Sequence, residues 1–179
     1  MAEPVSLKNF PELRQTYDYD CGATALQSVL AYYGIDARED QVMHVAKTTE
    51  TGTNPQNMAL AIEHYGLTPE AREMTLADVT GFIKRGIPVI ILLQAWTETP
   101  NVNWKNDWED GHYVIAIGYD DEKMLFEDPS AIERTYIPFQ ELLDRWHDSD
   151  VNGVHYVHYG IAVSGPEVDV DPELPEHMG

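Results

Sequence analysis

The pattern of apolar residues changes character about halfway along the chain, and this change constrains the fold more than any other feature. In the first half, apolar residues recur at the three- and four-residue spacing of helices that bury one face. The second half holds short, continuous apolar runs rich in β-branched residues, of which Pro88–Gln94 is the clearest. Helices followed by a sheet are typical of an α+β domain rather than of alternating βα units.

The helices are predicted from this spacing and from the residues that start and stop helices. Asp20 is suited to cap the first helix, and Gly34 to end it. Asn54 is suited to cap a later helix, with Pro55 as its first residue and Gly66 as its stop. The predicted helices are Asp20–Tyr33, Glu39–Lys47, Pro55–Tyr65, Leu76–Lys84 and Phe139–Trp146.

The strands are predicted from the apolar runs and the turns between them. A turn at Tyr119-Asp120-Asp121-Glu122 separates two of these runs, which therefore predict a hairpin. The predicted strands are Pro88–Gln94, His112–Gly118, Met124–Glu127 and Val154–Val163. We expect one domain over residues 1–164, and an extended or disordered acidic tail over residues 165–179.

The charge of the chain excludes some classes of partner. Eleven basic residues against 31 acidic ones give a formal net charge of −20. Nucleic acids and anionic membranes bind basic surfaces, so we expect neither as a partner. The charge is explained by solubility or by adaptation to a salty cytoplasm, and the functional alternative is attraction of a cationic peptide substrate.

The N-terminal sequence and the lengths of the apolar runs predict a cytoplasmic protein. No apolar run approaches the roughly 20 residues that a bilayer-spanning helix needs. Met1-Ala2-Glu3-Pro4 has neither the basic nor the apolar region of a signal peptide. The oligomeric state is not predicted.

Cys21 is the only cysteine, so the chain can form neither an internal disulfide nor a zinc site with several cysteines. It falls in the first turn of a predicted helix, where unpaired amide groups and the helix dipole favour a thiolate. The small residues Gly22 and Ala23 are expected to leave room for a substrate carbonyl. The alternative is that Cys21 is simply a small apolar residue in a buried helix.

A histidine and an aspartate are predicted to face each other across the hairpin. His112 opens one strand and Asp128 follows the next, and a direct pairing of the two centres the hairpin on Asp120, within the predicted turn. Asp128 would then accept the Nδ1–H of His112 and fix its tautomer, so that the other nitrogen could deprotonate a nearby cysteine. The alternative is a polar pair that faces solvent.

Gln15, six residues before Cys21, is a candidate donor for an oxyanion, because its amide could act together with the Cys21 backbone N–H. With this residue, the chain shows Gln15, Asp20-Cys21-Gly22, then His112 and Asp128-Pro129 in a pattern that resembles the C39-like peptidases of the papain-like fold. The likeness covers roughly residues 10–163.

The resemblance implies a cysteine peptidase that cleaves a peptide or isopeptide bond and needs no cofactor or metal. It implies that Cys21 is the nucleophile, His112 the base and then the acid, Asp128 the residue that orients His112, and Gln15 the oxyanion donor. Unlike the exporter-linked members, this chain shows neither a membrane segment nor a Walker A motif, so a stand-alone form is expected. A non-catalytic peptide-binding module and an amide-forming acyltransferase with the same triad are the alternatives.

Three other features have alternative interpretations. His155 and His158 lie three apart on a predicted strand and would point to opposite faces, which argues against a metal site. The segment Arg145–Asp148 could form a charged rim of the site, or Trp146 could be core with its neighbours at the surface. The loop Trp96–Asp110 is long for a compact domain, and its Trp104 and Trp108 either line a substrate subsite or pack.

Overall fold

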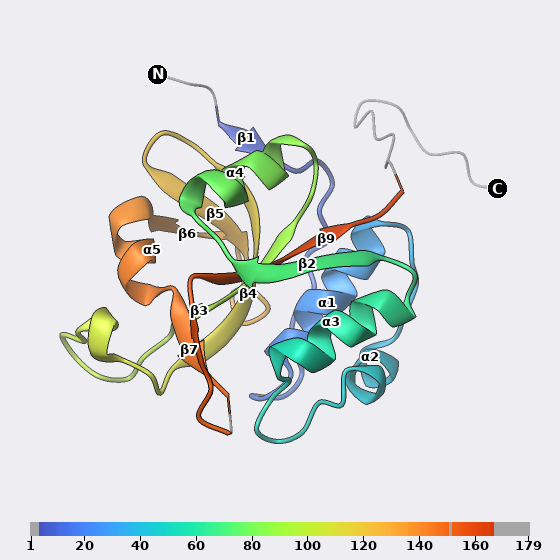
Figure 1. The fold of residues 1–179 in the computed structure, drawn as a ribbon, viewed down its shortest axis with the longest axis horizontal. Helices are drawn as coiled ribbons and strands as arrows, with labels where there is room; N and C mark the ends of the chain where they lie inside the picture. The colour runs from blue at the N-terminus through green and yellow to red at the C-terminus, as the bar shows by residue number, and fades with distance from the viewer. Residues whose placement is uncertain (1–3, 151, 167–179) are drawn as a thin grey trace.

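The main sheet of the protein joins strands from both ends of the sequence (Figure 1). The computed structural model describes residues 4–150 and 152–166. Its strands run in the spatial order β2-β9-β3-β4-β5-β6, with β1 added alongside β4, and all neighbours are antiparallel. Strands β7 and β8 form a second, two-stranded sheet. The strands are β1 (Val5–Ser6), β2 (Thr68–Glu73), β3 (Val89–Gln94), β4 (Gly111–Tyr119), β5 (Lys123–Glu127), β6 (Thr135–Pro138), β7 (His147–Ser149), β8 (His155–Val157) and β9 (Tyr159–Ser164).

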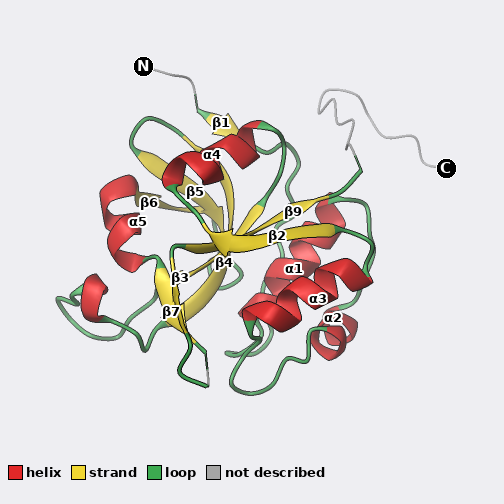
Figure 2. Cartoon of the chain, in the orientation of Figure 1, coloured by secondary structure: helices red, strands yellow, loops and turns green. Residues whose placement is uncertain are grey.

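Helices cover both faces of the sheet. Figure 2 shows α1, α2 and α3 grouped on one side of it and α4 on the other, while α5 lies beside β6. The central strand β3 is buried along its whole length, because both of its faces are covered, and this explains its continuous apolar sequence. The helices are α1 (Cys21–Tyr32), α2 (Glu39–Val45), α3 (Pro55–His64), α4 (Leu76–Lys84) and α5 (Phe139–Arg145), with a short 3₁₀ helix η1 (Trp104–Asn106).

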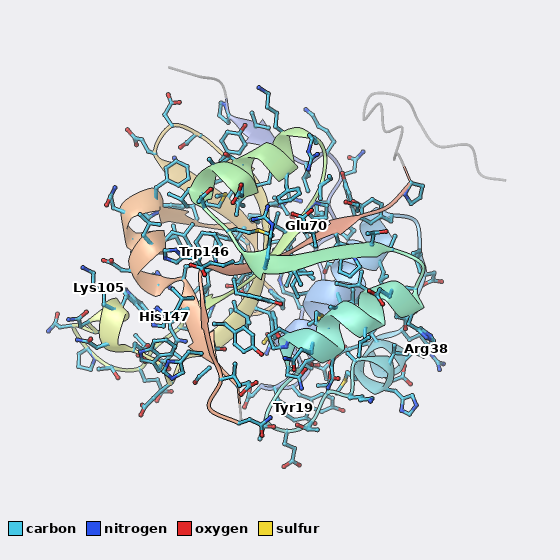
Figure 3. The ribbon with its side chains drawn as sticks, in the orientation of Figure 1. Tyr19, Arg38, Glu70, Lys105, Trp146 and His147 are labelled. Atoms are coloured by element: carbon cyan, nitrogen blue, oxygen red, sulfur yellow. The ribbon has the colours of Figure 1, made fainter. Side chains whose placement is uncertain are left out.

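The α+β prediction is confirmed, and the helices begin within one residue of their predicted starts. The Asn54 side chain accepts the N–H of Asn57 and caps α3 as expected, with Pro55 as its first residue. Trp146, labelled in Figure 3, is fully buried, so the core interpretation of this residue is correct. None of the described helices is both long and apolar enough to cross a membrane.

The strict order of helices first and sheet second is wrong, because β2 lies between α3 and α4 in the sequence. It forms the edge of the sheet beside β9, and its sequence Thr-Pro-Glu-Ala-Arg-Glu is polar and largely exposed. Such an edge strand lacks the apolar run that signals a buried one. The strand predicted over Val154–Val163 is divided into β8 and β9 at His158, which has a positive φ of 52°. The acidic tail predicted from residue 165 lies, from residue 167 on, outside the described residues.

Candidate active site

Cys21 is the first residue of α1 and is partly exposed. Asp20 precedes it at the N-cap position, but the prediction that its side chain caps α1 is wrong. The fully buried Asp20 carboxylate instead accepts the backbone N–H groups of Thr16 (3.2 Å) and Tyr17 (3.1 Å). Asp20 therefore turns the preceding loop back toward the start of the helix, and the first amides of α1 keep no side-chain cap.

Gly22 does not provide space for a substrate, which corrects the sequence interpretation. A Cβ at this position would lie 2.9 Å from both the Met58 Cε and the Tyr113 Cδ2. The small residue thus lets the start of α1 pack tightly on α3 and β4. Since Tyr113 is the neighbour of His112 on β4, this close packing sets the separation of Cys21 and His112.

His112 and Asp128 meet as expected, but through a different register and a different nitrogen. The Nε2 of His112 lies 2.6 Å from the Asp128 Oδ1, and the two residues are only 7% and 3% exposed. The β4–β5 ladder pairs Ile115 with Glu127, so its continuation sets Asp128 opposite Val114 rather than opposite His112. A shift of two residues keeps both side chains on one face, and the pair therefore meets diagonally.

The choice of nitrogen has a chemical consequence. Because Nε2 contacts Asp128, Nδ1 is the nitrogen left for Cys21, with which His112 also hydrogen-bonds. Burial lowers the pKa of His112, but hydrogen bonds to Asp128 and Cys21 and the charges of both partners raise it to about 10. The Asp128 carboxylate on one side and the Cys21 sulfur on the other therefore favour the protonated form of His112.

Trp96 is part of the site, and the sequence analysis missed its contact with Asp128. Its indole Nε1–H donates to the Asp128 Oδ2 at 2.8 Å, while the Ser130 backbone N–H donates to the Oδ1 at 2.8 Å. Burial raises the pKa of Asp128, but the hydrogen bonds from His112, Ser130 and Trp96 lower it below its usual value. Trp96 follows β3 and has a positive φ of 58°, and no local sequence signal indicates that its indole reaches Asp128.

The hydrogen bonds of Gln15 join it to Tyr17 and to the loop that carries Asp128. Its amide Nε2–H donates to the Tyr17 carbonyl at 2.7 Å, and its Oε1 accepts the Ser130 hydroxyl at 2.8 Å. Its backbone N–H also donates to the Pro129 carbonyl at 3.0 Å. These contacts fix the loop that precedes Cys21 to the loop that follows β5, and they use one of the two N–H groups of the Gln15 amide.

A cavity of about 350 Å³ opens beside the cysteine and the histidine. Its lining includes Cys21, Gly111 and His112, the segment between α2 and α3, and the β7-β8 pair. The walls carry hydroxyl and carboxylate groups and one ammonium group, that of Lys47. An arrangement with a thiol and an imidazolium at the edge of a cavity is suited to attack on a bound carbonyl group.

The other residues considered in the sequence are used for packing. Trp104 stacks on the Arg145 guanidinium, and Trp108 stacks on His147 and His155. His158 stacks on Trp146. Among the described residues, no cluster of three or more His, Cys, Asp or Glu side chains is arranged to hold a metal ion.

The fold and this arrangement define a papain-like cysteine-peptidase architecture. The chain belongs to the Peptidase C39 family, whose sequence profile matches residues 9–150. It is similar to the peptidase domain of Streptococcus ComA, with a TM-score of 0.67 and 16% identity over 87% of this chain and 98% of that one. It is also similar to a C39-like peptidase from Bacillus anthracis, with a TM-score of 0.70 and 19% identity over 92% of this chain and 98% of that one.

A third similar structure is a double glycine motif protease from an AMS/PCAT transporter, solved in complex with its leader peptide. It has a TM-score of 0.64 and 21% identity over 91% of this chain and 98% of that one. In sequence, the chain is 26% identical over 133 residues to the pediocin PA-1 transport/processing ATP-binding protein PedD of Pediococcus acidilactici. This match covers 74% of the chain but only 17% of PedD. An uncharacterized protein of Methanothermobacter marburgensis is 24% identical over 66% of this chain and 70% of its own length.

Proposed function

We propose that this protein is a cytoplasmic cysteine peptidase that hydrolyses a peptide or isopeptide bond through Cys21, His112 and Asp128. The observation that carries the proposal is the position of His112, which contacts Asp128 through Nε2 and hydrogen-bonds Cys21. The chain's membership of the Peptidase C39 family and its likeness to a protease solved with a leader peptide support a peptide substrate.

In the proposed reaction, the Cys21 thiolate attacks the carbonyl carbon of the scissile bond, and the oxygen becomes an oxyanion. His112 donates its proton to the leaving amine nitrogen, and the C–N bond breaks to leave a thioester on Cys21. His112 then takes a proton from water, whose hydroxide attacks the thioester and releases the acid and the thiolate. Asp128 keeps the imidazole oriented through both steps.

Gln15 is the proposed oxyanion donor together with the Cys21 backbone N–H. Its amide has two N–H groups, one of which donates to the Tyr17 carbonyl in the structure, so the second can donate to the oxyanion. The proposal predicts that Gln15→Ala lowers turnover by about 10²-fold, because one oxyanion donor is lost. In this variant, the alkylation of Cys21 by iodoacetamide should be unchanged, because alkylation forms no oxyanion.

Alkylation of Cys21 tests the proposal without a known substrate. The chain has one cysteine, so intact mass reports this site alone. A free cysteine is only about 0.3% thiolate at pH 6. We expect iodoacetamide to label the protein at pH 6 at least about tenfold faster than free cysteine, and His112→Ala to remove this advantage.

Labelling no faster than free cysteine at pH 6 would contradict the activated site and favour a non-catalytic module. Where labelling is fast, a library of internally quenched peptides should be cleaved by the protein and not by Cys21→Ala. Acyl transfer to an added amine in preference to water would instead identify an acyltransferase.

A further inference from the structure

The cavity beside Cys21 has an acidic wall next to the proposed catalytic residues. Asp148 of β7 lines the cavity together with Cys21 and His112. His147, labelled in Figure 3, is its neighbour and marks where β7 begins. A carboxylate so close to the proposed nucleophile would meet the part of a substrate adjacent to the scissile bond.

Gln94, the last residue of β3, fixes the position of the Asp148 carboxylate. The Gln94 side chain is fully buried, and its Nε2 donates to the Asp148 Oδ1 at 3.1 Å and to the His147 carbonyl at 2.9 Å. Its Oε1 accepts the Asp110 N–H at 2.7 Å. Because the Gln94 amide is buried, where an unpaired amide would be costly, these bonds hold β7 against the segment that leads into His112.

Gly111 lets the carboxylate lie directly beside the backbone of β4. A Cβ on Gly111 would overlap both carboxylate oxygens and the Cγ of Asp148. Because the next residue is His112, the carboxylate is placed one residue from the proposed base. The glycine is thus explained by the position of Asp148 rather than by a need for unusual backbone angles.

No cation compensates this carboxylate within the described residues, where Asp148 forms no ion pair with a lysine, arginine or histidine. Burial, followed by the nearby charges of Asp107 and Asp150, raises the pKa of Asp148 to about 6 against the hydrogen bonds from Gln94 and the Ser149 backbone. Asp150 also lines the cavity, and so does the exposed ammonium of Lys47 on the segment after α2. A partly buried anion without a counter-ion is unfavourable, and a cation that enters the cavity would relieve this cost.

We propose that the cavity binds a lysine or arginine side chain of the peptide substrate next to the scissile bond, and that Asp148 determines this specificity. The proposal rests on the proposed function, because it assigns the substrate class of the same site. A charge-assisted hydrogen bond in such a place supports roughly a 10- to 100-fold preference over an uncharged side chain of similar length. The net charge of −20 would also favour the approach of a cationic peptide.

The test uses short peptidyl acyloxymethyl ketones in matched sets. Within a set, the probes differ at a single residue, which is lysine, norleucine or glutamate. In one set this residue is next to the reactive group, and in the other it is the residue before that one. The Cys21 sulfur displaces the carboxylate leaving group and forms a thioether, which intact mass detects. At pH 7.5 we expect the lysine probe of at least one set to react at least about tenfold faster than its norleucine partner, and the glutamate probe to react slowest.

Variants and pH then assign the preference to Asp148. Asp148→Asn should bring the ratio of lysine to norleucine rates close to one. Asp144→Asn removes the same charge from an exposed position on α5, outside the cavity, and should leave the ratio unchanged. In the unmodified protein the ratio should fall between pH 7.5 and pH 5, because Asp148 becomes protonated as the pH drops through about 6. Because both probes use the same sulfur, the ratio removes any change in the reactivity of Cys21.

The outcomes separate this inference from the proposed function. If no probe labels Cys21, the proposed function fails. If probes label Cys21 but the lysine and norleucine rates are equal, or the preference survives Asp148→Asn, the acidic subsite is overturned while the peptidase proposal stands. The pH dependence of the unmodified protein decides the case if Asp148→Asn does not fold.

Discussion

At the scale of single residues, the site depends on how each oxygen of Asp128 is used. The Oδ1 contacts the His112 Nε2 and accepts the Ser130 N–H, and the Oδ2 accepts the N–H of the Trp96 indole. With the Oδ2 occupied, the carboxylate is held in the orientation in which Oδ1 faces the imidazole. Trp96 thus acts on His112 through Asp128, as a positioning residue.

Replacement of Trp96 by Phe tests this role. The change keeps an aromatic ring but removes the N–H donor, so we expect the rate of Cys21 alkylation at pH 6 to fall about 3- to 10-fold, the value of one hydrogen bond. The pKa of His112, measured from the pH profile of alkylation, should also fall, because Asp128 is then less firmly held. Trp104→Phe is the matched control, since Trp104 belongs to the same loop but stacks on Arg145. Equal losses in both variants would show that the loop needs only its packing.

At the scale of elements, two carboxylates from different segments hold the loop before α1. The buried Asp20 accepts the N–H groups of Thr16 and Tyr17, and Glu39 at the start of α2 accepts the Thr16 hydroxyl at 2.8 Å. Burial, then a hydrogen bond with Glu39, raises the pKa of Asp20 to about 6. A carboxyl group whose pKa is raised on folding stabilises the folded state at pH values below its usual pKa near 3.8. This contribution is lost as the pH rises through about 6.

Glu39→Gln should therefore stabilise the protein at neutral pH. The amide keeps an acceptor for Thr16 and can donate to the ionised Asp20, so we expect about 1 kcal/mol more stability at pH 7 and a smaller gain at pH 4.5. Urea unfolding at the two pH values measures both. Asp40→Asn removes the same charge from the same first turn of α2, where Asp40 is exposed, forms an ion pair with Arg38 and accepts the Gln41 N–H. If Glu39→Gln is no more stable at pH 7 than Asp40→Asn, repulsion between Glu39 and Asp20 does not destabilise the fold.

Local signals account for the elements that the sequence predicted correctly. The helices begin where capping residues and apolar spacing coincide, as at Asn54 and Thr75, whose side chains cap α3 and α4. The polar edge strand β2 lacks such signals, because its partner β9 lies far away in the sequence, and the short β6 was missed although its partner β5 directly precedes it. The hairpin register was predicted two residues out because the turn lies later than expected: Tyr119 pairs with Met124, and the bulge between Ala116 and Gly118 then changes the register by only one residue.

The candidate site was predictable to the same extent. The pairing of His112 with Asp128 follows from strand alternation, which survives a shift of two residues. The contact of Gln15 with Ser130 and that of Trp96 with Asp128 depend on how distant loops meet, and no spacing in the sequence encodes them. The roles of Gln15, Cys21, His112 and Asp128 stay predictions until the alkylation and cleavage experiments are done.

At the scale of the whole molecule, the charge is the property that sets the conditions for stability. The chain has 31 acidic residues and only 11 basic ones, so most carboxylates have no cationic partner of their own. Repulsion among them extends over about 10 Å at 0.1 M salt but only about 3 Å at 1 M. The folded chain, which brings these charges together, should therefore gain stability as salt is added.

We expect the melting temperature at pH 7.5 to rise by about 5–10 °C between 0.05 M and 1 M NaCl, which corresponds to a few kcal/mol for a chain of this length. Salt also strengthens the burial of apolar groups, whatever the charge of the protein. The control is the same titration near pH 4.4, the isoelectric point of the sequence, where the net charge and its repulsion vanish while the apolar effect remains. A steep rise at pH 7.5 with a shallow one at pH 4.4 assigns the effect to charge. Equal slopes would mean that the acidic surface does not destabilise the fold, and attraction of a cationic substrate would then be the better explanation of the charge.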